Sequence, residues 1–92
     1  MNYQKLDASL AMAIKDVPEP ETPNFVVFIH TYSPLEPDAI AMLEGEGISN
    51  ITETKDVFTA TVSYNTISLL SDQSWVKYLK LSNKLRLVTL RN

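Results

Sequence analysis

The sequence predicts a small α+β domain in which helices cover one face of an antiparallel sheet. Residues 25–31, 57–64 and 75–81 are rich in β-branched and aromatic residues, as strands are. A stretch whose apolar residues recur at helical spacing lies between the first two strands, and a second such stretch lies between the last two. Strands that alternate with short helices in a chain of 92 residues favour one mixed domain with a modest core.

The first element is an expected amphipathic helix within residues 1–17. Leu6, Leu10 and Ile14 recur at helical spacing and form one apolar stripe, which predicts a helix from about residue 3 to residue 15. A terminal helix of this kind docks on its own domain more often than it binds a partner. Residues 18–24 are expected to form a linker, because three prolines exclude both a helix and a ladder strand there.

The main domain is expected to span residues 25–92 and to begin with a central strand. Residues 25–31, FVVFIHT, are apolar on both faces, as a strand in the middle of a sheet is. After a loop with two prolines, residues 37–46 are predicted to form a helix that Gly47 ends, because a left-handed residue is wanted there. Residues 48–53 are predicted to form a short strand.

The second half of the domain repeats this pattern. Residues 57–64 alternate between an apolar face and a mostly hydroxylic face, which predicts a strand. Asn65 stands where a helix N-cap is expected, and Ile67 and Leu70 follow on one helical side. Residues 75–81 return to the composition of a strand.

These elements give the order strand, helix, strand, strand, helix, strand, preceded by an extra helix. That order is the ferredoxin-like βαββαβ plan, a four-stranded antiparallel sheet with two helices on one face. The first and third strands are central in this plan, and here they are the two least charged runs, residues 25–31 and 57–64. Residues 85–90 fit either an extra edge strand or an extended tail.

Composition narrows the classes of function. The net charge of −3 argues against a nucleic-acid partner, because phosphates favour a basic face. The chain has no cysteine, which excludes a disulfide framework and a cysteine-ligated metal. No apolar run is long enough to span a bilayer, and no secretory signal is seen, so no membrane partner is expected. We expect a cytoplasmic domain, or an exported one if the sequence is a fragment of a longer precursor.

Reactive side chains do not gather in a pattern that predicts an enzyme or a cofactor. His30 is the only histidine and has apolar neighbours, so a metal cluster is not expected. The carboxylates fall on predicted loops and helix ends, where solvated charge is the ordinary interpretation. The sequence contains neither a phosphate-binding glycine loop nor an activated-serine motif. We therefore expect a binding module with no catalytic, metal or cofactor-binding residues.

A module of this plan has one sheet face that its two helices leave open. Strand alternation assigns to this open face Val26, Phe28, His30, Val57, Thr59, Thr61, Lys77 and Leu79. An exposed patch that is apolar and hydroxylic marks an interface more often than not. The alternative is that the N-terminal helix folds across the face.

Motifs along the chain resemble those of one family. LDASL, VVFIHT, LEGEGI, VFTATVS, ISLLS and WVKYLKLSNKLR occur in the order and spacing found in the propeptides of bacterial subtilisin-like serine proteases. The matching positions include the Thr-Ala pair at 59–60 and the apolar residues Ile67, Leu70 and Val76. The resemblance covers about residues 6–87.

This resemblance implies a ferredoxin-like domain that inhibits a subtilisin-like serine protease and acts as a chaperone for its folding. The open face would contact the protease, and the last residues would lie in its substrate cleft, namely Val88, Thr89, Leu90, Arg91 and Asn92. No catalytic domain follows in this sequence, which implies a free-standing relative acting in trans or a fragment. The rival hypothesis is a homo-oligomerisation or regulatory module, a homodimer for example, that uses the same open face.

Overall fold

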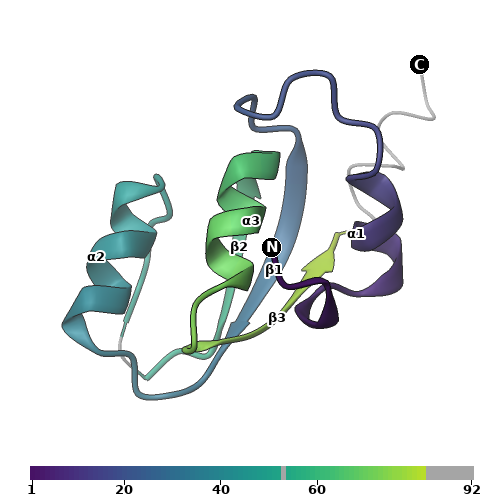
Figure 1. The fold of residues 1–92 in the computed structure, drawn as a ribbon. Helices are drawn as coiled ribbons and strands as arrows, with labels where there is room; N and C mark the ends of the chain where they lie inside the picture. Colours follow the sequence, from purple (N-terminus) through teal and green to yellow (C-terminus); the bar gives the residue numbers. More distant parts are fainter. Residues whose placement is uncertain (53, 83–92) are drawn as a thin grey trace.

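A computed structural model describes residues 1–52 and 54–82 and shows a mixed α+β arrangement, the class predicted from the sequence (Figure 1). Its elements in chain order are the 3-10 helix η1 (Tyr3–Lys5), α1 (Ala8–Ala13), β1 (Phe25–Thr31), α2 (Pro37–Gly45), β2 (Val57–Val62), α3 (Tyr64–Ser71) and β3 (Val76–Leu81). In Figure 1, α3 lies over the middle of the sheet, α2 lies on the β2 side and α1 lies beside β3.

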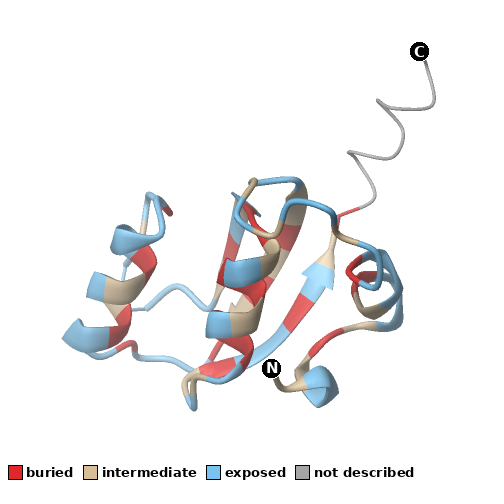
Figure 2. Ribbon diagram, turned by 45° about the horizontal axis from the view of Figure 1, so that its top comes forward, coloured by how far each residue is buried: buried red, intermediate tan, exposed pale blue. Residues whose placement is uncertain are grey.

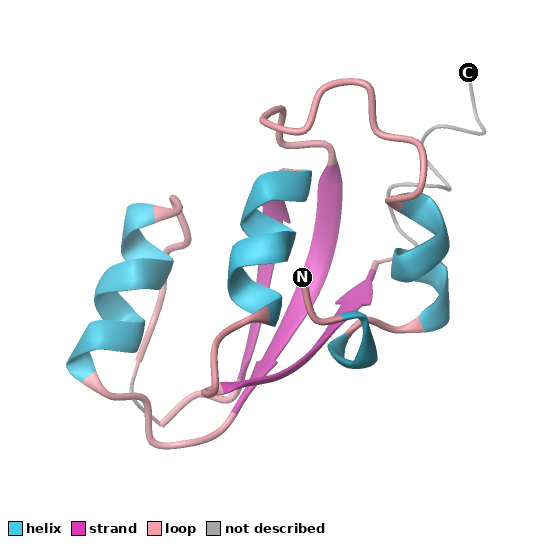
Figure 3. Cartoon of the chain, viewed as in Figure 1, coloured by secondary structure: helices cyan, strands magenta, loops and turns pink. Residues whose placement is uncertain are grey.

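Within the described residues the sheet contains three strands in the order β2-β1-β3, and both pairings are antiparallel (Figure 3). β1 is central and has the predicted bounds. β2 lies at an edge of this sheet, whereas the sequence predicted it as a second central strand. The difference arises because residues 48–52, the described part of the predicted second strand, form no strand. The four-stranded ferredoxin-like sheet is therefore not confirmed.

The end of α2 explains why this strand does not form. The Ile48 amide donates to the Leu43 carbonyl at 3.1 Å, and the Gly47 amide donates to the Glu44 carbonyl at 3.0 Å. These two bonds form a Schellman motif, and Gly47, with φ of +83°, is the left-handed residue that the sequence predicted. Ile48 is buried in the core as part of this helix end, and Asn50 adopts a second positive φ of 61°. The backbone is thus turned twice where an extended run was expected.

The start of α3 lies one residue before the predicted N-cap. The Ser63 side chain accepts a hydrogen bond from the Thr66 amide at 3.1 Å, so Ser63 is the N-cap and Asn65 lies inside the helix. The prediction that Asn65 is the N-cap is wrong, because Ser63, two residues earlier, supplies the side-chain oxygen that caps the helix. Ile67 and Leu70 are fully buried, as their spacing predicted.

A common hydrophobic core lies between the sheet and the helices, as the buried inner sides of these elements show in Figure 2. Its fully buried apolar residues come from every helix and strand except η1 and include Leu10, Val27, Ile29, Leu43, Phe58, Ile67, Leu70, Val76 and Leu79. The N-terminal helix therefore belongs to the same core as the sheet.

The N-terminal segment packs against the edge of β3 and does not cross the open face. Leu6 forms a parallel bridge with Leu79, and the Asp7 amide donates to the Leu79 carbonyl at 3.0 Å. One oxygen of the Asp7 carboxylate accepts a hydrogen bond from the Leu10 amide at 3.1 Å, and this bond caps α1. The same oxygen accepts from the Leu81 amide of β3, also at 3.1 Å. Asp7 thus fastens α1 to β3, and the helix itself is shorter than the one predicted.

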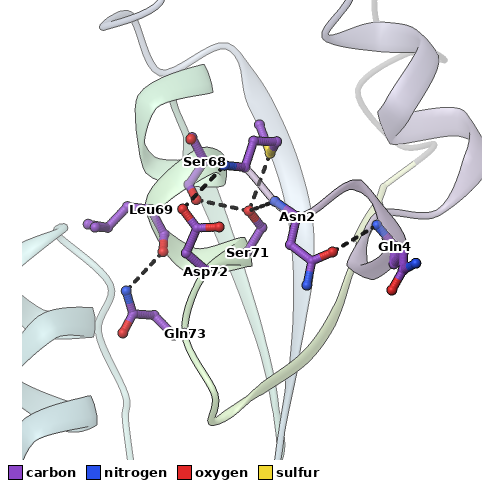
Figure 4. A network of polar contacts seen from close by, with 8 residues as sticks. Asn2, Gln4, Ser68, Leu69, Ser71, Asp72 and Gln73 are labelled. Carbon is purple, nitrogen blue, oxygen red and sulfur yellow. Dashed lines mark hydrogen bonds and ion pairs between the residues drawn. The ribbon is translucent and has the colours of Figure 1, made fainter.

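The first residues are held at the end of α3. Figure 4 shows the Asn2 amide donating to Ser71 Oγ at 2.9 Å, and the Ser71 hydroxyl donating to the Ser68 carbonyl, also at 2.9 Å. The terminal ammonium of Met1 lies 3.3 Å from Asp72 Oδ2. These contacts keep the start of the chain beside α3 and away from the opposite face of the sheet.

Candidate functional site

The open face of the sheet is the candidate site, and β1 forms its centre. Val26, Phe28 and His30 are partly buried, whereas Val27, Ile29 and Thr31, which alternate with them, are fully buried beneath the helices. On β2, Thr59 and Thr61 are exposed. The antiparallel register places Thr59 opposite Phe28 and Thr61 opposite Val26. Cross-strand neighbours share a face, so the structure brings these predicted residues together.

β3 contributes two of the residues predicted for the open face, and the structure places them in different environments. Lys77 is exposed, and its Nζ lies 5.3 Å from the centre of the Tyr32 ring. Leu79 is fully buried and pairs with Ile29 on the covered face. The assignment of Leu79 to the open face is therefore wrong.

An irregular register at the start of β3 causes this error. Tyr78 pairs with His30, but the next pair along the strands joins Val76 to Thr31. Lys77 is therefore an extra residue, as in a β-bulge, and the alternation of faces changes phase there. The sequence does contain a signal of this change, because Tyr78 and Lys80, whose side chains end in polar groups, alternate with two leucines after Lys77.

Two further residues of the open face were missed by strict alternation. The Tyr78 ring stacks on the His30 ring, with 4.1 Å between centroids and 13° between planes. Lys80 is exposed and pairs with Phe28. β3 therefore adds an aromatic ring and a cation to the face where the sequence predicted a leucine.

The electrostatics of the face centre on His30. Burial lowers the pKa of His30 below its usual value of 6.5, and the charges of Lys80 and Lys77 lower it further, while Asp56 acts in the opposite direction. The imidazole is therefore mostly neutral at pH 7. The face then presents a neutral stacked pair, an apolar centre and two ammonium groups.

This chemistry suits contact with another macromolecule. Aromatic and apolar area at the centre with polar groups around it is the usual anatomy of a protein interface. Within residues 1–52 and 54–82, no group of three or more His, Cys, Asp or Glu side chains is arranged to hold a metal ion. In the same residues, no helix has the length and apolar character needed to cross a membrane.

The other predicted contact region, residues 88–92, lies outside the described residues. Comparisons of the chain with protein-family models, with curated proteins and with solved structures return no match. Function is therefore inferred from the chain's own residues.

Proposed function

We propose that this domain binds a partner protein through the open face of its sheet, and that the partner is a subtilisin-like serine protease that the domain inhibits or helps to fold. One observation carries the proposal. The described helices and the N-terminal segment all pack on the covered face or at an edge, and they leave partly buried apolar side chains of β1 and the exposed Tyr78 ring on the other face. Such a patch favours an interface over inert surface.

The protease is favoured as the partner by the sequence motifs. In LDASL, the two leucines enter the core and the aspartate joins α1 to β3, so this motif has a definite role in the fold. The order β2-β1-β3 is also the order of the third, first and fourth strands in a ferredoxin-like sheet. Both features support a propeptide-like plan in which one edge strand is absent from the described residues.

The composition of the open face suggests how it would dock. Phe28 and Val26 supply apolar area at the centre, and Thr59 and Thr61 supply hydroxyls beside it. Lysines on β3 border this area, so a partner surface that carries carboxylates is favoured. Residues 88–92 would enter the substrate cleft by strand addition, and the folded domain would reduce the cost of ordering them.

Inhibition of subtilisin by the full chain tests the proposal. We expect hydrolysis of a chromogenic peptide to fall as the chain is added, and deletion of residues 89–92 to remove most of the potency. Phe28→Glu should weaken inhibition about tenfold or more, because it buries a charge in the interface. Thr59→Glu changes an exposed side chain and should act in the same direction without disturbing the core.

Met12→Glu is the matched control, because Met12 is 69% exposed on α1, away from the open face. It should inhibit like the unmodified chain. Equal potency of Phe28→Glu, Thr59→Glu and Met12→Glu would exclude the open face as the protease contact. Absence of any inhibition would exclude the protease as the partner.

The rival function, a homo-oligomerisation module, is favoured by a separate observation. In the described residues β2 pairs only with β1, so its outer edge has no strand beside it. A strand of valine, threonine, alanine and phenylalanine carries no charge to protect that edge against a second copy. A dimer by light scattering, combined with no effect on subtilisin, would establish this rival.

A further inference from the structure

A second candidate site lies at the end of the sheet, beyond the open face. A hollow of about 470 Å³ is lined by residues of the loop that follows β1, the start of α2 and the turn that precedes β3. In Figure 1 this loop and the start of β3 lie together at the lower end of the sheet. The Tyr32 amide donates to the Trp75 carbonyl at 3.0 Å and so joins two of these segments.

Two aromatic and two acidic residues are among those that line the hollow, namely Tyr32, Trp75, Glu36 and Asp38, and Trp75 also packs against the core. Tyr32 is 56% exposed, so much of its ring is accessible. Glu36 is the N-cap residue of α2 but makes no side-chain capping bond, and Asp38 follows in the first turn. Neither carboxylate forms an ion pair in the described part of the chain. Their negative charge is therefore available to a ligand.

The chain already places a cation on one of these rings. Lys77 Nζ lies 5.3 Å from the centre of the Tyr32 ring, within the range of a cation–π contact. This contact is independent of the two carboxylates, and it shows that the environment of the Tyr32 ring accepts an ammonium group.

We propose that this hollow binds an organic cation, an alkylammonium or guanidinium group, between the rings of Tyr32 and Trp75 and the carboxylates of Glu36 and Asp38. Aromatic faces attract such cations, and carboxylates beside them add Coulombic attraction. A volume of about 470 Å³ is within the range of small-ligand sites. The lining of the hollow shares no residue with the open face, although Lys77 of that face reaches the Tyr32 ring, and the site does not depend on the protease proposal.

Trp75 provides a direct measurement, because it is the only tryptophan in the chain. We expect choline to change the Trp75 fluorescence saturably. Its uncharged isostere, 3,3-dimethylbutan-1-ol, should bind at least about tenfold more weakly. N-acetyl-lysine methylamide and N-acetyl-arginine methylamide test the other source of the same chemistry, a basic side chain of a polypeptide. If choline binds more tightly, the natural ligand is a small organic cation, and if the amino-acid derivatives bind more tightly, it is a basic side chain of a polypeptide.

Three variants sharpen the test. Glu36→Gln combined with Asp38→Asn should weaken binding of the best cation about tenfold at low salt, since two exposed charges are lost. Glu44→Gln is the matched control, because it removes an exposed charge at the other end of α2 and should leave binding unchanged. Lys77→Gln should tighten binding several-fold, because it removes an ammonium that competes for the Tyr32 ring.

Several results would each overturn the site. The isostere and choline could bind equally, no cation could change the fluorescence, or the double variant could bind as the unmodified chain does. The Trp75→Phe variant, followed by calorimetry, should keep cation binding because it keeps an aromatic face, and complete loss of binding with an intact fold would also contradict the proposal. All measurements use the chain alone, so a failed protease assay has no bearing on them.

Discussion

The two faces of the sheet come from the same three strands, yet they differ in burial. On the covered face, Val27, Ile29, Phe58 and Leu79 are at most 1% exposed. On the open face, the residues one position away are partly buried on β1 and exposed at Thr59 and Lys80. Core and candidate binding surface are therefore separated by a single residue along each strand, and a one-residue change of phase exchanges them.

Substitutions on the two faces are therefore expected to have different effects. A substitution on the covered face removes packing and should appear as lost stability. A substitution on the open face should leave the fold stable and appear only in binding. β3 is the most informative strand, because its phase was the one wrongly predicted from the sequence.

The largest expected effect is that of Leu79→Ala. Leu79 is fully buried, so the truncation should lower the free energy of unfolding by about 2–5 kcal/mol, from lost transfer energy and a residual cavity. Urea denaturation followed by circular dichroism measures this change. Lys80→Ala, at the next position on the open face, is the control and should shift the value by no more than about 0.5 kcal/mol. Equal costs for the two would place Leu79 on the open face after all.

A smaller effect is expected from Asp7→Ala, which tests why α1 covers an edge of the sheet and not the open face. The carboxylate caps α1 and accepts from the Leu81 amide, so its loss should cost about 2–3 kcal/mol of unfolding free energy. Asp7→Asn keeps an acceptor oxygen and should recover most of the loss in the same denaturation experiment.

Asp16→Ala is the matched control for charge, because Asp16 is exposed and outside the helix. Its effect should stay within about 0.5 kcal/mol. If Asp7→Ala were as mild as Asp16→Ala, the joint between α1 and β3 would not depend on this carboxylate.

Features decided by neighbouring residues could be predicted from the sequence. The bounds of β1 followed from an uncharged apolar run, and the left-handed Gly47 followed from the need of a helix end. The burial of Ile67 and Leu70 followed from helical spacing. On the candidate site, the same local alternation placed the β1 and β2 residues on a common face.

Features decided by distant pairing were beyond this kind of reasoning. The extra residue at Lys77 is defined by the pairing with β1, so alternation counted through Lys77 placed Leu79 on the wrong face, and only the alternation of residues 78–81 taken by itself indicates the correct one. Ile48 is a local exception: it has the composition of a strand residue, but its amide donates to the Leu43 carbonyl five residues earlier, which makes it part of a helix end. The second bond of Asp7 is made with Leu81, far along the chain, and no local pattern predicts it.

The smallest expected effect is a pH dependence that originates on the open face, at His30. Burial and the charges of Lys80 and Lys77 lower its pKa below 6.5, despite the opposing charge of Asp56 and alongside the stacked ring of Tyr78. The unfolded chain then binds more protons than the folded chain between the two pKa values. The contribution of His30 to stability is therefore complete above pH 6.5 and is lost as the pH falls toward the folded-state pKa.

His30→Gln removes the titrating group, so the free energy of unfolding should fall less steeply from pH 7 to pH 5 in this variant than in the unmodified chain. The slopes of unfolding free energy against pH are compared, and not the free energies themselves, because the variant also loses the stacking on Tyr78. An NMR titration of the imidazole gives the pKa directly, and Lys80→Gln should move it back toward 6.5, since one repelling charge is removed. A measured pKa at or above 6.5 would contradict both the burial of this ring and the arrangement of lysines around it, and with them the description of the open face.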